Sequence, residues 1–317
     1  MATDIKIIGC GISGITTGIC LLEAGYKVSI VAKQLPQNTT SAVAAAIWFP
    51  YQIMPQHKAN EWSLSTYYKF EQLAQVAHSG VSMSPLKLYL NHESEAWWKK
   101  SFPEGRLTEL QPNQIPSQFK IGYEAMVPIS ETHIYLNFLL NMFKELGGSV
   151  ELAQVDDIFG LAKCSFAVIN CTGLGARKLM NDREMYPIYG QIVKVDLQDG
   201  VTSITAETPV SDVPHEVAYI VRRSDCLVLG GTAIKGKETD TAENQYTNGI
   251  IQRCRELDSN LKEVNIQSVT AGLRPGRTRV RLERTDNIVH NYGHGGGGYT
   301  VSWGCAEEVV TLVNEIS

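Results

Sequence analysis

The stretch Ile5–Gly14, IKIIGCGISG, decides the fold of this 317-residue chain. Its first four residues form a short, mostly β-branched apolar run, which is typical of a buried parallel strand. Residues 15–24 then have helical spacing that stops at Gly25, and residues 27–31 form a second apolar run. Strand, G-x-G-x-x-G turn, helix and strand in this order predict a dinucleotide-binding βαβ unit. A structural βαβ unit with coincidental glycines is the alternative.

The end of the second apolar run departs from the usual pattern. An Asp or Glu at this point normally binds the ribose hydroxyls, whereas this chain has Ala32-Lys33-Gln34. Lys33 facing a phosphate, as in NADP binding, and Lys33 pointing into solvent are both open. An NAD(P)-dependent dehydrogenase is therefore a rival at this point.

Composition narrows the function classes. The 33 acidic and 28 basic residues give a net charge of -5, which argues against nucleic acid or an anionic membrane as partner. No apolar run reaches transmembrane length, and the start lacks the pattern of a signal peptide, so we expect a cytoplasmic protein. Seven cysteines without CxxC spacing predict reduced thiols and no metal site.

The middle of the chain loses the βαβ rhythm and later regains it. We expect helices at 60–78, 133–146 and 242–260, strands at 87–90, 124–128, 149–152, 165–170 and 189–196, and a hairpin of 218–221 with 226–229. The predicted fold class is α/β, with a Rossmann-type domain interleaved with an α+β substrate domain built on a large mixed sheet. The expected boundaries are 1–50, 141–185 and 268–317 for the first domain, and 51–140 and 186–267 for the second.

Two further segments suggest a close-fitting ligand site. Residues 290–300, HNYGHGGGGYT, precede a helix-like segment, and glycine allows backbone to approach a ligand closely. Such a loop before a helix suits an anion site, while a flexible loop is the alternative. The hydroxyls of residues 39–41, beside the small residues 42–46, suit a pyrophosphate and a flat ring; a capped helix start is the alternative there.

Six motifs in order carry a resemblance to a known family. They are Val43–Tyr51, Asn170–Gly173, Gly190–Asp196, Leu229–Gly231, Gly272–Pro275 and His290–Gly296. From about residue 5 to residue 312 the chain resembles the D-amino-acid oxidase and D-aspartate oxidase family of flavoproteins. The resemblance implies FAD as cofactor. It also implies oxidative deamination of a D-amino acid to the 2-oxo acid, ammonia and hydrogen peroxide, with hydride transfer from Cα to flavin N5.

The implied partners are a small amino-acid substrate and O2, in a monomer or homodimer. An oxidase of glycine, a secondary amine or a specialised biosynthetic amino acid is the alternative on the same fold. A flavin-binding protein without turnover is a third possibility, which the substrate-binding positions argue against.

The resemblance also implies roles for single residues. Arg274 matches the arginine that pairs with the substrate carboxylate, and its planar fork suits that task. Tyr219 matches a hydroxyl on the same carboxylate, and the carbonyl of Gly296 the acceptor of the substrate amine. His215 stands where the family's lid often has a tyrosine; it either contacts the substrate side chain or sits in the lid. The implied cofactor-binding positions are Gly9, Gly11, Ile12, Ser13, Gly14, Lys33, Thr39, Thr40, Ser41, Ala46, Ile47, Val155, Thr172, Gly173, Gly295, Gly296, Gly298, Tyr299 and Thr300.

The substrate side chain stays undecided. Ile47 and Phe49 are apolar, while Arg222, Arg223 and Lys235 lie nearby in the sequence. A hairpin turn predicts that Arg222 and Arg223 point into solvent. Neutral and acidic substrates are therefore both open.

Overall fold

The structure is a computed structural model that describes residues 4–91, 96–206 and 216–316. Its first sheet has six strands in the order β14-β15-β7-β1-β2-β6. All neighbours are parallel except β14 and β15. The strands are β1 (Asp4–Ile8), β2 (Lys27–Ala32), β6 (Ser149–Leu152), β7 (Ala167–Asn170), β14 (Arg281–Thr285) and β15 (Ile288–Tyr292).

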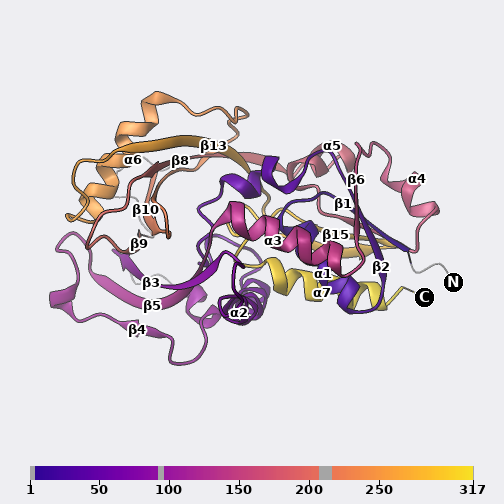
Figure 1. Ribbon diagram of the computed structural model, residues 1–317, viewed down its shortest axis with the longest axis horizontal. Helices are drawn as coiled ribbons and strands as arrows, with labels where there is room; N and C mark the ends of the chain where they lie inside the picture. The colour runs from indigo at the N-terminus through magenta and orange to yellow at the C-terminus, as the bar shows by residue number, and fades with distance from the viewer. Residues whose placement is uncertain (1–3, 92–95, 207–215, 317) are drawn as a thin grey trace.

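A second sheet of nine strands forms the other half of the molecule (Figure 1). Its order is β12-β8-β11-β10-β9-β3-β5-β4, and β13 pairs with the remaining side of β8. Antiparallel pairs dominate, and β3 with β9 is a parallel one, so the sheet is mixed as expected. The strands are β3 (Val81–Leu90), β4 (Leu107–Glu109), β5 (Ile121–Ser130), β8 (Tyr186–Val195), β9 (Ser203–Ala206), β10 (Glu216–Arg222), β11 (Leu227–Thr232), β12 (Ile234–Lys235) and β13 (Ile266–Gly276).

The helices pack mainly on the first sheet and between the halves. They are α1 (Ile12–Glu23), α2 (Gln56–Leu73), α3 (Thr132–Glu145), α4 (Ile158–Lys163), α5 (Ala176–Leu179), α6 (Asn244–Leu257) and α7 (Ser302–Asn314). Helix α1 packs against α7 and α3, and α7 also packs against α2, whereas α6 covers β10 and β11. Both ends of the chain lie at the side of the first sheet (Figure 1).

One glycine explains how closely α7 approaches α2. A Cβ on Gly304 would stand 2.4 Å from both Cα and O of Trp62, so no larger residue fits without separating the backbones. The amide of Gly304 also donates to the buried hydroxyl of Thr66 at 3.0 Å. Helix α2 is thereby tied to the helix that follows the glycine-rich loop.

The predicted βαβ unit is confirmed. Five residue pairs join β1 to β2 in parallel, from Asp4 with Lys27 to Ile8 with Val31. Helix α1 lies between them and ends before Gly25, whose φ of +91° is the left-handed conformation expected of a residue after a helix. The predicted hairpin is also confirmed, because β10 and β11 pair antiparallel with Ile220 opposite Leu229.

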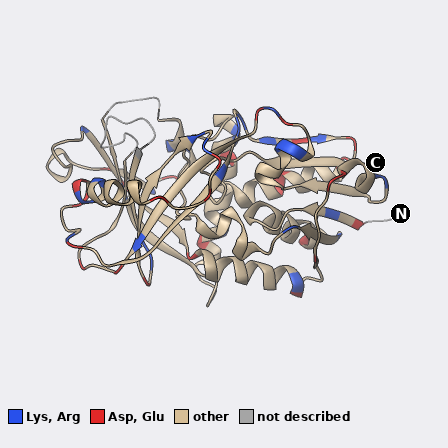
Figure 2. Cartoon of the chain, turned by 90° about the horizontal axis from the view of Figure 1, so that it is seen from above, with Lys and Arg blue, Asp and Glu red and all other residues tan. Residues whose placement is uncertain are grey.

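Charged residues of both signs are interspersed over the described chain (Figure 2). None of the helices in the described ranges is long and apolar enough to cross a bilayer. The same ranges hold no group of three or more His, Cys, Asp or Glu side chains suited to a metal ion.

Candidate active site

A cavity of about 1260 Å³ has walls from both sheets. One end lies at the carboxyl ends of β1, β2 and β7, where open α/β sheets bind ligands. The other end is lined by side chains of β8, β10 and β13. Its volume exceeds the roughly 300–1,000 Å³ that is usual for a single small-molecule pocket. The cavity therefore has room for a large cofactor and a substrate side by side.

The glycine turn after β1 forms the floor of the first end. Gly9 has φ +108°, and a Cβ there would stand 2.5 Å from the carbonyl oxygen of Cys171. A Cβ on Gly14 would stand 2.0 Å from the carbonyl oxygen of Gly9. The N-terminus of α1 therefore lies directly on the turn, and its positive end faces the cavity through Gly11, Ile12 and Ser13.

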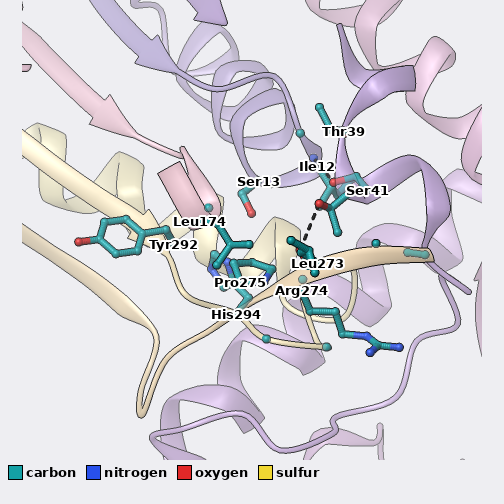
Figure 3. Close-up of a pocket in the computed structure, with 18 of the residues that line it drawn as sticks. Ile12, Ser13, Thr39, Ser41, Leu174, Leu273, Arg274, Pro275, Tyr292 and His294 are labelled. Carbon is teal, nitrogen blue, oxygen red and sulfur yellow. Dashed lines mark hydrogen bonds between the residues drawn. The ribbon is translucent and has the colours of Figure 1, made fainter. Parts of the chain in front are cut away.

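The predicted hydroxyl cluster lies next to this helix end (Figure 3). The side chain of Ser41 accepts a hydrogen bond from the amide of Ile12 at 3.0 Å. Thr40 donates to the carbonyl of Leu273 at 3.2 Å, and Tyr299 donates to the carbonyl of Ser41 at 2.8 Å. These bonds join α1, the 39–41 segment and β13 around one wall of the cavity.

Lys33 lies at the far edge of this end. It follows the last residue of β2, is exposed, and lines the cavity. Val155 and Asp156 line the same end after β6, where the amide of Ala153 donates to the carbonyl of Ala32 at 3.0 Å. The only carboxylate on this rim is thus supplied after β6 rather than at the end of β2, among the described residues that line the cavity.

Arg274 and Tyr219 meet at the second end of the cavity. Arg274 extends from β13 away from Ser13 (Figure 3) and donates through Nη1 to the carbonyl of Thr232 at 2.9 Å. Desolvation raises the pKa of the Tyr219 hydroxyl, and the charge of Arg274 and a hydrogen bond with it oppose that increase. The two residues predicted to bind one carboxylate are therefore brought together.

Two strand glycines make room for these side chains. A Cβ on Gly190 would stand 2.1 Å from Nη1 of Arg274, and one on Gly230 would stand 1.8 Å from Cζ of Tyr219. Both glycines belong to the motifs that carry the family resemblance, but neither was predicted to be a site residue. The signal that could have found them is a glycine inside a strand, which often marks a close approach.

Gly296, the third residue predicted to bind the substrate, lies beside Arg274. A Cβ on it would be 3.8 Å from Cδ of Arg274 and 3.5 Å from Cδ1 of Tyr51. Tyr51 lines the cavity and was missed as a site residue, although it ends one of the quoted motifs. Its place beside Gly296 comes from the fold, because 245 residues separate the two in sequence.

A buried polar network stabilises the glycine-rich loop. Nε2 of His294 donates a hydrogen bond to Oδ1 of Asn291 at 3.0 Å, and Nδ2 of Asn291 donates to the hydroxyl of Thr17 at 3.0 Å. Burial lowers the pKa of His294 to about 4, so its imidazole is neutral at pH 7. Burial likewise lowers the pKa of His290 to about 4. The loop is therefore held by neutral hydrogen bonds to α1.

Most predicted positions line this one cavity. Those that do are Gly9, Gly11, Ile12, Ser13, Lys33, Thr39, Thr40, Ser41, Ala46, Ile47, Val155, Thr172, Gly173, Tyr219, Arg274, Gly295, Gly296, Gly298 and Tyr299. Gly14 instead packs on Gly9, and the hydroxyl of Thr300 donates to the carbonyl of Phe49 at 2.9 Å. His215 lies outside the described residues.

The expectation that Arg222 and Arg223 point into solvent was wrong. Arg222 donates through Nη1 to the carbonyls of Gln198 at 2.7 Å and Val201 at 3.0 Å. Arg223 is only 5% exposed. Hairpin-turn residues usually reach solvent, and Ser224 and Asp225 do so, but backbone carbonyls of neighbouring loops bind both guanidinium groups.

The glycine turn, the hydroxyl cluster and the size of the cavity fit FAD. A Cβ on Gly9 or Gly14 would clash with backbone, so these glycines keep the turn tight beneath the helix end, which suits a pyrophosphate. Arg274 and Tyr219 at the opposite end suit a carboxylate substrate. Fold and site together define a dinucleotide-binding oxidoreductase that acts on a small carboxylate-bearing molecule.

The comparisons with known proteins are more specific. The model of the family described as FAD dependent oxidoreductase matches residues 4–312. The chain is 36% identical to a D-amino-acid oxidase from Rubrobacter xylanophilus, over 96% of this chain and 94% of that protein. It is also 36% identical to a D-amino-acid oxidase from Dictyostelium discoideum, over 98% and 92%. The chain belongs to the D-amino-acid oxidase family of FAD-dependent oxidoreductases.

Solved structures agree in fold. A glycine oxidase from Geobacillus kaustophilus superposes with a TM-score of 0.78 at 18% identity, over 99% of this chain and 95% of that one. An L-proline dehydrogenase from P. horikoshii gives 0.81 at 14%, over 98% and 93%. The predicted fold class and the predicted FAD cofactor are confirmed.

Proposed function

We propose that this enzyme oxidises D-amino acids to 2-oxo acids, ammonia and hydrogen peroxide, with O2 as the second substrate. The observation that carries the proposal is the contact of Arg274 with Tyr219 beside Gly296, at the end of a cavity that begins at the FAD-binding turn. The curated relatives named D-amino-acid oxidase support the same substrate class.

The proposed roles follow from what each group can donate or accept. The Arg274 guanidinium carries five donors, of which the carbonyl of Thr232 and the hydroxyl of Tyr219 use two, so others are left for the substrate carboxylate. Tyr219 donates to the same carboxylate. The carbonyl of Gly296 accepts a hydrogen bond from the substrate amine, which fixes the other end of the substrate. Two anchors on opposite sides of Cα restrict its orientation and contribute a near-attack geometry.

The chain holds the cofactor with backbone and small side chains. The α1 N-terminus, Gly9 and Gly11 are proposed to bind the pyrophosphate, and Thr39, Thr40 and Ser41 the adjacent groups. When bound, FAD supplies the oxidant for the Cα–H bond of the substrate. The remaining proposed cofactor positions are Ile12, Ser13, Gly14, Lys33, Ala46, Ile47, Val155, Thr172, Gly173, Gly295, Gly296, Gly298, Tyr299 and Thr300.

We propose a neutral substrate side chain. The sheet face that carries Arg274 and Tyr219 presents Ile188, Ile192 and Val221 to the cavity. Arg222 and Arg223 bind backbone carbonyls instead of facing the substrate. Lys235 lines the cavity, but its ammonium lies 4.1 Å from the centre of the Tyr186 ring, a cation–π contact. Apolar contacts therefore dominate around the substrate position.

A peroxide assay over both hands of the amino acids, glycine and N-methylglycine tests the proposal. We expect peroxide with apolar D-amino acids, such as D-alanine and D-valine, and little with D-aspartate or L-amino acids. Turnover of glycine or N-methylglycine alone would favour the alternative substrate class. Absence of anaerobic flavin bleaching with every compound would refute the oxidase function.

Arg274→Ala tests the proposed role of Arg274 in binding the substrate carboxylate. Loss of the charged partner of the carboxylate costs roughly 2–5 kcal/mol, so kcat/KM falls by more than tenfold while FAD stays bound. Lys235→Met is the control, because a neutral substrate does not use its charge. A large loss of activity in Lys235→Met, confined to acidic substrates, would argue for an acidic substrate instead.

We also propose a cytoplasmic enzyme that is a monomer or homodimer. The chain division proposed is 1–50, 141–185 and 268–317 for FAD and 51–140 and 186–267 for substrate. Support comes from the sheets, since β1, β2, β6, β7, β14 and β15 all fall in the first set. Strand β13 spans a boundary, because it pairs with β8 although most of it falls in the first set.

A further inference from the structure

Arg223 is a buried cation that the proposed reaction does not use. It lies just after β10 and is 5% exposed. Its Nη2 donates to the carbonyls of Ala44 and Ala45, each at 2.9 Å, whereas its buried Nε has no hydrogen-bond partner. A guanidinium keeps its charge in such surroundings, and desolvating it is costly. The burial of this charge and its incomplete hydrogen bonding indicate that the cation has a specific role at this point.

The carbonyls that Arg223 binds belong to a wall of the cofactor cavity. Residues 43–47 line the cavity, whereas Arg223 does not, so the guanidinium lies behind this wall. Within it Ala46 has φ +55°, a left-handed conformation that costs a non-glycine residue about 1 kcal/mol or more. The wall is therefore a strained segment that neighbouring contacts must hold in place.

Strand β5 fixes the same wall from another side. Thr132, just after β5, donates to the carbonyl of Ala42 at 2.8 Å, and the amide of Ser130 donates to the carbonyl of Ala46 at 2.9 Å. The carbonyls of Ala44 and Ala45, between these two fixed points, are bound by Arg223. Without Arg223 the middle of the wall would lose its hydrogen-bond donors.

The charge of Arg223 also affects the pKa values of two tyrosines that line the cavity. Desolvation raises the pKa of Tyr299, and the charge of Arg223 opposes that increase. The same charge also opposes the increase in the pKa of Tyr219. Both tyrosines line the cavity, one at the glycine-rich loop and one at the substrate end. A negative charge that develops on a bound group between them would be stabilised in the same way.

We propose that Arg223 is a positioning residue for FAD, which fixes the 44–46 wall from behind and adds a buried positive charge beside the cofactor. The proposal rests on FAD binding and not on the identity of the amino acid oxidised. Its measurements need no substrate, so they stay informative if the proposed substrate class is wrong.

Arg223→Met and its neighbour Arg222→Met form a matched pair. Each loses a guanidinium that binds two backbone carbonyls, but the partners of Arg222 are Gln198 and Val201, which do not line the cavity. We expect the dissociation constant for FAD, measured by reconstituting apoprotein, to rise about tenfold or more in Arg223→Met. The flavin midpoint potential should also become more negative. In Arg222→Met the dissociation constant for FAD should stay within about twofold of the parent's, and the midpoint potential should be unchanged within experimental error. Its loss of thermal stability should be comparable to that of Arg223→Met.

Arg223→Lys separates position from charge and serves if Arg223→Met does not fold. A lysine retains the charge without the planar fork, so the midpoint potential should stay near that of the parent while FAD binds more weakly. Unchanged FAD affinity and potential in Arg223→Met would overturn the proposal. Equal losses of FAD affinity in Arg222→Met and Arg223→Met would also overturn it. If Arg223→Met does not fold and only Arg223→Lys can be measured, FAD affinity equal to the parent's in Arg223→Lys would overturn it.

Discussion

Arg274 occupies the space where a side chain on Gly190 would stand. A Cβ on Gly190 would lie 2.1 Å from Nη1 and 2.2 Å from Cζ of Arg274. The two residues come from neighbouring antiparallel strands, with Arg274 opposite Ile188 and Gly272 opposite Gly190. Because β8 has no side chain at position 190, it leaves room for Arg274, the proposed partner of the substrate carboxylate.

Gly190→Ala should impair substrate binding without unfolding the protein. The clash involves the far end of a flexible side chain, so Arg274 moves aside and its carboxylate contacts weaken. We expect KM to rise about 10- to 100-fold, which corresponds to the loss of a charged hydrogen bond. Gly122→Ala is the control, because the atoms nearest to its Cβ would belong to Ile115 and Leu110, at 3.0 Å and away from the cavity. A parental KM in Gly190→Ala would contradict the argument.

Tyr219→Phe should raise KM about tenfold and leave FAD binding intact, because it removes one hydrogen bond to a charged group. Steady-state kinetics with the best D-amino acid measure the effect. Tyr189→Phe is the matched control: its hydroxyl donates to Gln191 at 2.6 Å in the same sheet, but it does not line the cavity. Equal KM changes in both variants would mean that Tyr219 acts only through the fold.

Gly14→Ala should abolish FAD binding. Its Cβ would lie 2.0 Å from the backbone oxygen of Gly9, which cannot move without distorting the turn. Gly18→Ala, one turn later in α1, is the control, since its Cβ would meet the ring of Phe143 at 2.7 Å rather than backbone. We expect Gly18→Ala to lose stability yet remain yellow after purification. Retention of FAD by Gly14→Ala would show that the turn is more adaptable than its geometry indicates.

Stability should fall as the pH is lowered from 6.5 towards 4. Burial lowers the pKa of His290 and of His294 from about 6.5 to about 4, so the unfolded chain binds protons that the folded one excludes. Each histidine contributes a slope of up to ~1.4 kcal/mol per pH unit in that window, and no slope above it. Urea unfolding of the holoenzyme at pH 7.5, 6.5 and 5.5, followed by tryptophan fluorescence, measures it. His290→Asn should reduce the slope, whereas a flat profile in the parent would contradict these assignments.

The sequence was sufficient to predict the elements of the cofactor half of the molecule, because the patterns that indicate them lie within short segments of the chain. The turn from Gly9 to Gly14 and the helix after it follow from neighbouring residues, and β1 and β2 appear where the apolar runs predict them. Family resemblance added Arg274 and Tyr219, which the fold brings together from β13 and β10. Neither periodicity nor composition could have paired residues 55 positions apart.

The misjudged residues depend on tertiary contacts. Arg223 looked like a turn residue because the local sequence describes a hairpin, yet its partners are Ala44 and Ala45, which lie almost 180 residues earlier. Tyr51 was overlooked for a similar reason, since only the folded chain brings it to Gly296. Pairings of this kind are set by how the two sheets face each other.

Because both sheets line the cavity, bound FAD should stabilise the folded protein as well as take part in the reaction. A molecule that fills a volume of about 1260 Å³ touches the walls of both sheets, and ligands that bind only the native state raise stability with their free concentration. Folding yield and resistance to proteolysis should therefore follow riboflavin supply. In a cell, the amount of this enzyme should therefore fall when the supply of flavin falls, in addition to the activity lost with the cofactor.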